Sequence, residues 1–139
     1  MGRVFFNTRK NVVDIAAAYT VLASDSGNVF NINQASAYEI TLPLMSTIET
    51  GWNCEFILGT VAANAVTIAN HTDEDTIVGI VSYSDTDTSN LATATAESAV
   101  DEIVFISGAQ LGDTVRLVAN GANYFATAQA HDAAHITIS

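Results

Sequence analysis

Short apolar runs rich in β-branched residues recur along the chain, and their spacing limits the fold more than any other feature of the sequence. Turn signals made of Gly, Asn, Asp and Ser separate the runs, and the chain contains a single Pro. Val, Ile and Thr have restricted side-chain rotamers and fit a pleated sheet better than a helix. We therefore predict an all-β fold, an antiparallel β-sandwich or jelly-roll-like single domain. The runs cover residues 19–23, 29–32, 38–42, 54–58, 65–69, 76–81, 102–107, 114–119, 123–126 and 135–138.

Alternation of apolar and polar residues within the runs supports the strand assignment. Cys54, Phe56 and Leu58 share one face of their run, while Glu55 lies on the other face. The segments 77–81 and 103–106 are apolar on both faces, which requires a second layer or another subunit to cover the outer face. The dipeptide at 120–121, Asn-Gly, predicts a tight hairpin turn because both residue types tolerate a positive φ.

Helical signals are weak, and we expect at most one or two short helical turns. Pro43 fits the first turn of a short helix over residues 44–48, which Gly51 would end. The length of 139 residues is typical of one domain and is sufficient for a core without disulfides. We divide the chain into an N-terminal basic arm, residues 1–12, and a β-sandwich domain, residues 13–139.

The charge of the chain is strongly acidic and unevenly placed. Four basic residues oppose fifteen acidic ones, which gives a formal net charge of -11, and Arg116 is the only Lys or Arg after residue 10. Because clustered Lys and Arg are needed to neutralise DNA phosphates, we expect no direct binding of nucleic acid. The basic first ten residues form either a solvated terminus or an arm that docks on an acidic partner. The candidate docking residues of the arm are Arg3, Phe5, Phe6, Arg9 and Lys10.

No signal for secretion or membrane insertion is recognisable. Phe5 and Phe6 are not followed by an apolar segment and a small-residue cleavage site. The longest uncharged run, residues 56–72, is too short and too polar to span a bilayer. We expect a soluble protein that is made inside a cell and has no membrane partner.

Residue types that commonly carry chemistry are few and do not form a known motif. Cys54 is the only cysteine and lies on the apolar face of its run, so we expect an inert core thiol. His131 and His135 have the i, i+4 spacing of a helical metal site, but in a terminal strand this spacing would keep the imidazoles apart. The acidic residues 73–75 form either a solvated turn or a calcium-binding loop. We expect no catalytic residue, no metal and no cofactor.

Two other functions remain open at this stage. Trp52 and Tyr83 could contribute to a face that recognises host glycans, although core packing is the commoner role of such aromatic residues. A small β-fold enzyme that uses a pair of carboxylates is also compatible with the sequence, because the separation of such a pair is set in space.

A series of motifs along residues 19–128 resembles tailed-phage virion proteins. The family includes capsid decoration (cement) proteins, head fibres and tail fibres. The motifs are Tyr19-Thr20-Val21-Leu22, Ile40-Thr41-Leu42-Pro43, Gly51-Trp52, Asn64-Ala65-Val66-Thr67-Ile68 and Gly112-Asp113-Thr114-Val115-Arg116-Leu117-Val118. Residues 82–100 depart from this pattern.

Within that family the chain is most similar to a decoration protein. Fibres normally continue into long repeats or a coiled coil, which these 139 residues do not contain. The resemblance implies a non-enzymatic homotrimer on the outer capsid surface of a virion, made in the host cytoplasm, with the major capsid protein as its partner. A head-fibre or tail-fibre module that binds host glycan is the alternative. We expect the subunit interface to include Ile77, Val78, Ile80, Ile103 and Phe105.

Overall fold

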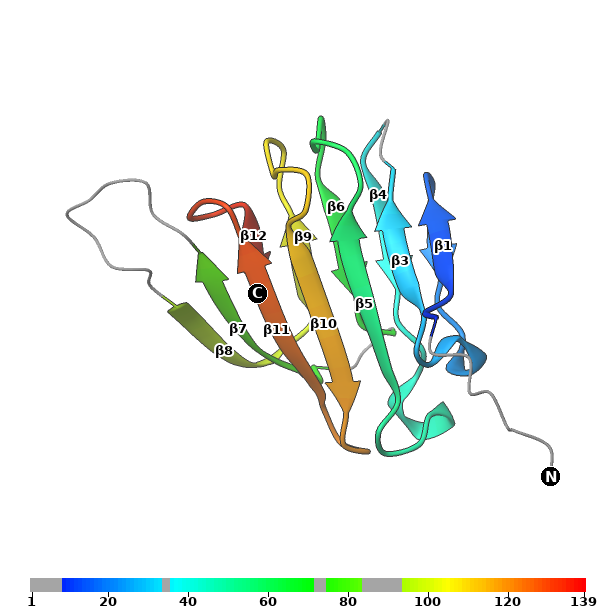
Figure 1. The fold of residues 1–139 in the computed structure, drawn as a ribbon. Coiled ribbons are helices and arrows are strands. Elements are labelled where there is room, and N and C mark those ends of the chain that lie inside the picture. Colours follow the sequence, from blue (N-terminus) through cyan, green and yellow to red (C-terminus); the bar gives the residue numbers. More distant parts are fainter. Residues whose placement is uncertain (1–8, 34–35, 72–74, 84–93) are drawn as a thin grey trace, which may run out of the picture.

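Two β-sheets pack face to face in the computed structural model of the protein (Figure 1). The structure describes residues 9–33, 36–71, 75–83 and 94–139, with the backbone alone for residues 94–99. In the described part, one sheet has seven strands in the order β1 (Val12–Ile15), β3 (Val29–Ile32), β5 (Asn53–Leu58), β10 (Thr114–Ala119), β11 (Tyr124–Ala130), β7 (Ile77–Tyr83) and β8 (Ala94–Val100). The other has five, in the order β12 (Ile136–Ile138), β9 (Glu102–Phe105), β6 (Val66–Ala69), β4 (Tyr38–Thr41) and β2 (Tyr19–Thr20).

The predicted all-β sandwich is confirmed. Helical structure in the described residues is limited to two 3-10 turns, η1 (Ala23–Asp25) and η2 (Met45–Thr47). The second of these lies in the segment 44–48 for which we expected a short helix. Strand β1 begins at Val12, next to the boundary that we expected between the arm and the sandwich.

Strand pairing is mixed, which differs from the antiparallel pairing that we expected. From β1 to β6 successive strands alternate between the two sheets, so strands two apart in sequence become neighbours (Figure 1). Because the chain crosses from one sheet to the other and back, it returns in the same direction and the pairs are parallel. The parallel pairs are β1–β3, β3–β5, β2–β4, β4–β6 and β7–β11.

The hairpin predicted at residues 120–121 is present between β10 and β11, which pair antiparallel. Gly121 has φ 90°, and the Asn120 side-chain oxygen accepts hydrogen bonds from the backbone N–H groups of Ala122 and Asn123. The side chain of Asn120 therefore closes the turn in the manner typical of an Asx turn.

The core lies between the sheets and includes three residues that we expected at a subunit interface. Ile77, Ile103 and Phe105 have no exposed surface, because the opposite sheet covers them. We therefore assign these three residues to the core of the folded chain and not to a contact with a partner. Val78 and Ile80 alternate with the inward residues of β7 and face outward.

The predicted arm is described only at its C-terminal end. Arg9 and Lys10 are exposed, whereas Arg3, Phe5 and Phe6 lie outside the described residues. The described chain contains no helix of the length and apolarity needed to cross a bilayer.

Candidate functional site

The outer face of the seven-stranded sheet carries a group of outward apolar side chains, three of them exposed and one half-buried, which we call the apolar band. It consists of Val78 and Ile80 on β7, Val118 on β10 and Phe125 on β11. Val118, Phe125 and Val78 are consecutive partners in one row across the sheet, and Ile80 lies in the next row opposite Thr127. Ile80, Val118 and Phe125 expose 39%, 41% and 45% of their surface. The run over residues 77–81 is therefore covered by the second sheet on one side only.

The opposite outer face, on the five-stranded sheet, has a different character. Val104, the outward residue of the other doubly apolar run, is only half exposed and lies between Thr67 and Thr137 in register. Glu39 and Glu102 add negative charge to this face, and its described strands carry no Lys or Arg. Among the described residues, the larger group of outward apolar side chains therefore lies on the seven-stranded sheet.

A charged cluster borders the apolar band. Glu55 on β5 lies between two cations on the same outer face, with its Oε2 atom 2.6 Å from Lys10 Nζ and its Oε1 atom 3.9 Å from Arg116 Nη2. Val118 lies two residues after Arg116 on β10, so cations and apolar side chains share this part of the sheet. The face therefore carries apolar side chains beside two cations that share one carboxylate.

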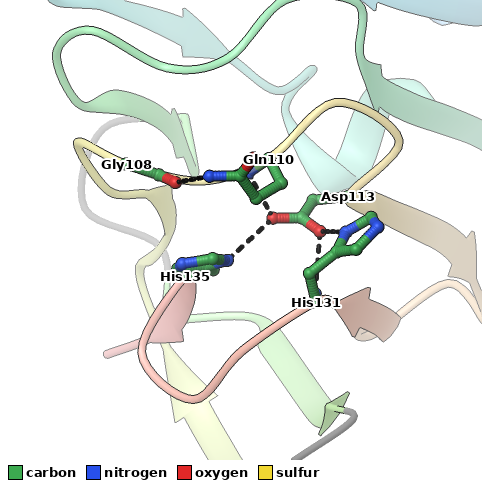
Figure 2. Close-up of polar contacts among 5 residues, drawn as sticks. All are labelled: Gly108, Gln110, Asp113, His131 and His135. Atoms are coloured by element: carbon green, nitrogen blue, oxygen red, sulfur yellow. Dashed lines mark hydrogen bonds and ion pairs between the residues drawn. The ribbon is translucent and has the colours of Figure 1, made fainter. Parts of the chain in front are cut away.

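A second polar cluster lies at one end of the sandwich, where Asp113 joins the loop before β10 to the turn after β11 (Figure 2). The Asp113 carboxylate is completely buried. Its Oδ1 atom accepts a hydrogen bond from the backbone N–H of His131 at 2.9 Å and lies 2.6 Å from His131 Nδ1. Its Oδ2 atom accepts the backbone N–H of Gln110 at 2.9 Å and lies 3.4 Å from His135 Nδ1.

The geometry around Asp113 corrects one expectation from the sequence. We expected the i, i+4 spacing to keep His131 and His135 apart, but a turn carries both imidazoles to the same carboxylate. Sequence reasoning missed Asp113 itself, although an Asp directly after Gly112 in a turn was a signal for side-chain capping of local backbone N–H groups.

An aspartate that holds an imidazole is also found in catalytic dyads and behind metal ligands. The Asp113 carboxylate accepts hydrogen bonds from two backbone N–H groups and lies beside the Nδ1 atoms of two imidazoles, and its described contacts include no Ser, Thr or Cys side chain. Within the described residues no group of three or more His, Cys, Asp or Glu side chains is arranged to hold a metal ion. We interpret the cluster as a structural latch, by which we mean that the Asp113 carboxylate joins the loop before β10 to the turn after β11 and so stabilises this end of the sandwich.

Cys54 and Trp52, which the sequence offered as a reactive thiol and a glycan-binding aromatic residue, are both buried. The Cys54 thiol faces the core, and burial, with Asp25 and Glu55 nearby, raises its pKa far above the ordinary value. Trp52 is also buried. Its Nε1 donates a hydrogen bond to the Ala23 carbonyl, and its ring packs edge-on against Tyr124. Trp52 lines a surface hollow of about 450 Å³ together with Glu49 and Thr50, but only 4% of its surface is exposed for stacking against a sugar.

Two predicted features lie wholly or partly outside the described residues. In the acidic segment 73–75 only Asp75 is described, and it is exposed. Tyr83 ends β7 and is half-buried, next to residues 84–93, which are not described. The calcium-loop interpretation and the role of the loop around Tyr83 therefore remain predictions.

No protein-family model, curated protein or solved structure matches the chain. The resemblance to virion proteins consequently rests on the sequence motifs alone.

Proposed function

We propose that the chain is a non-enzymatic decoration protein that binds the outer surface of a virus capsid as a homotrimer and stabilises the shell. The observation that carries this proposal is the apolar band, Val78, Ile80, Val118 and Phe125, on the outer face of the seven-stranded sheet. The resemblance of the sequence motifs to phage decoration proteins supplies the kind of assembly.

The composition of the band favours a protein contact. Contiguous exposed apolar side chains with a polar border are typical of interaction surfaces, and Phe is enriched in their centres. Burial of such a surface against another chain removes its contact with water, at about 25 cal/mol for each Å² of apolar area. Val78 and Ile80 are also the two predicted interface residues that face outward.

The position of the arm supports a contact with the shell. Lys10 is bound to Glu55, so the described chain begins over the outer face of the seven-stranded sheet. Eight further residues, fully extended, span roughly 28 Å, which is enough to reach a neighbouring protein. We place Arg3, Phe5, Phe6 and Arg9 on the major capsid protein, with the Phe side chains as apolar anchors.

Trimerisation would strengthen a weak contact made by a single arm. Three arms on one particle-bound trimer act together, and the effective concentration of the second and third arm raises the overall affinity. The net charge of -11 would keep decorated particles apart in solution.

The test is co-sedimentation with capsids that lack this chain. We expect the full chain to sediment with the capsids, and a variant without residues 2–8 to remain a trimer but stay in the supernatant. Because Arg9 and Lys10 are retained in that variant, the Lys10–Glu55 ion pair is preserved. Equal sedimentation of both forms would exclude the arm as the shell contact. Failure of the full chain to bind capsids, together with binding to a host glycan array, would favour the receptor-binding alternative.

A further inference from the structure

Arg116 has more hydrogen-bonding capacity than the chain uses. A guanidinium carries five N–H donors in a planar fork. Within the described residues its one charged contact is Glu55 Oε1 at 3.9 Å, and it makes no hydrogen bond to another side chain or to the backbone. Glu55 in turn directs its other oxygen to Lys10 Nζ at 2.6 Å. The guanidinium, whose side chain is 63% exposed, is therefore free to bind an incoming anion.

The surroundings of Arg116 provide further donors. A surface hollow of about 190 Å³ is lined by Glu55, Thr114, Arg116, Thr127 and Gln129. Arg116 is the direct partner of both Glu55 and Thr127 across the sheet. Hydroxyl and amide groups beside a guanidinium match a carboxylate, which accepts several hydrogen bonds at once.

The apolar band adjoins this hollow. Thr127 pairs with Ile80, and Val118 on the strand of Arg116 pairs with Phe125. When the band is covered by a partner, water is excluded from its border, and a charge-assisted hydrogen bond there becomes stronger.

The charge distribution indicates which partner fits this surface. Each chain has fifteen acidic and four basic residues, so two copies repel each other over most of their surfaces. Among the side chains that the structure describes on the outer face of the seven-stranded sheet, Lys10 and Arg116 balance Asp14 and Glu55. A second copy therefore meets the least repulsion here and can bring one of its many carboxylates to Arg116.

We infer that the outer face of the seven-stranded sheet is the surface through which copies of this chain associate, with a carboxylate of the neighbouring copy bound by Arg116 beside the apolar band. This inference rests on the proposed function, since it assigns the contact that would build the homotrimer. In a homotrimer this contact is head-to-tail, so the apolar band and Arg116 of one copy meet a different, carboxylate-bearing surface of the next copy, and such contacts close into a ring when the rotation between copies permits it.

The test compares the self-association of two variants that change the net charge by the same amount. Arg116→Glu lowers the charge by two units inside the proposed contact. The double variant Thr20→Glu with Thr137→Glu does the same on the exposed outer face of the other sheet. Sedimentation equilibrium of the full chain gives the association constant of each, and circular dichroism verifies the fold. Arg116 has no tight intramolecular contact, so we expect both variants to fold.

We expect Arg116→Glu to weaken association at least tenfold more than the control, because a like charge replaces one partner of a charge-assisted pair. Arg116→Lys should retain part of the association, since it keeps the charge but loses the planar fork. A tenfold difference supports the inference, and any smaller difference overturns it.

If the wild-type chain is trimeric and binds capsids while Arg116→Glu equals the control, only the inference fails. A wild-type chain that stays monomeric overturns the inference, and capsid binding then decides the proposed function separately.

Discussion

Replacement of Asp113 with Ala removes the buried acceptor of two part-buried hydrogen bonds, which come from the backbone N–H groups of Gln110 and His131. A buried donor left without a partner costs about 1–3 kcal/mol, and a part-buried donor, which water can reach, lies near the lower end of that range. The change also removes the carboxylate that lies 2.6 Å from His131 Nδ1 and 3.4 Å from His135 Nδ1. Part of the cost is offset, because the buried carboxylate no longer has to be desolvated. We expect the free energy of unfolding to fall by about 3 kcal/mol.

The measurement is urea denaturation followed by circular dichroism, with thermal unfolding as a second readout. For a domain of this size, a loss of about 3 kcal/mol lowers Tm by roughly 10 °C. Asp132→Ala, in the same turn but exposed, is the matched control and should change stability by less than about 0.5 kcal/mol. If Asp113→Ala unfolds at the same urea concentration as the wild type, the latch does not hold the two connections together and the reasoning is refuted.

Two further predictions concern the core. Gly79 faces the five-stranded sheet where a Cβ would overlap the Ile138 side chain, so Gly79→Ala should destabilise the fold by about 1–3 kcal/mol, and Ile138→Val should restore part of the loss in a double-mutant cycle. Equal urea midpoints for wild type and Gly79→Ala would contradict this close packing. Because burial raises the pKa of Cys54, its thiol should react with iodoacetamide at pH 8 only as fast as the chain opens, and urea should accelerate the reaction. Rapid alkylation of the folded chain would show that the thiol is accessible.

Most of the strands coincide with runs predicted from the sequence, because many of them alternate between a buried and an exposed face, but β1 (Val12–Ile15) and β8 (Ala94–Val100) were not predicted. In β5, for example, Cys54, Phe56 and Leu58 are buried while Glu55 points outward. The neighbours of each strand could not be predicted in this way, since alternation identifies the residues of one face and not the adjacent strand. The parallel pairs arise from crossings between the sheets, which leave no local signal in the sequence.

The candidate surface was predictable only in part. Apolar residues on both faces of the segment 77–81 indicated a covered outer face, and Val78 and Ile80 are indeed directed outward. The same pattern could not tell which face of a run is the core, so Ile103 and Phe105 were assigned to an interface although they are buried. Phe125 was not identified as a surface residue, because its exposure depends on the place of β11 in the sheet order.

The central claim is that the apolar band is a contact surface, and self-association of a band variant tests it most directly. Ile80→Thr with Phe125→Thr replaces two exposed side chains of the band, while Val61→Thr with Leu111→Thr changes two exposed apolar side chains outside the band. In sedimentation equilibrium, we predict that the double variant Ile80→Thr with Phe125→Thr is monomeric at concentrations at which the wild type and the double variant Val61→Thr with Leu111→Thr are trimers. Trimers of the same strength in all three proteins would contradict the account.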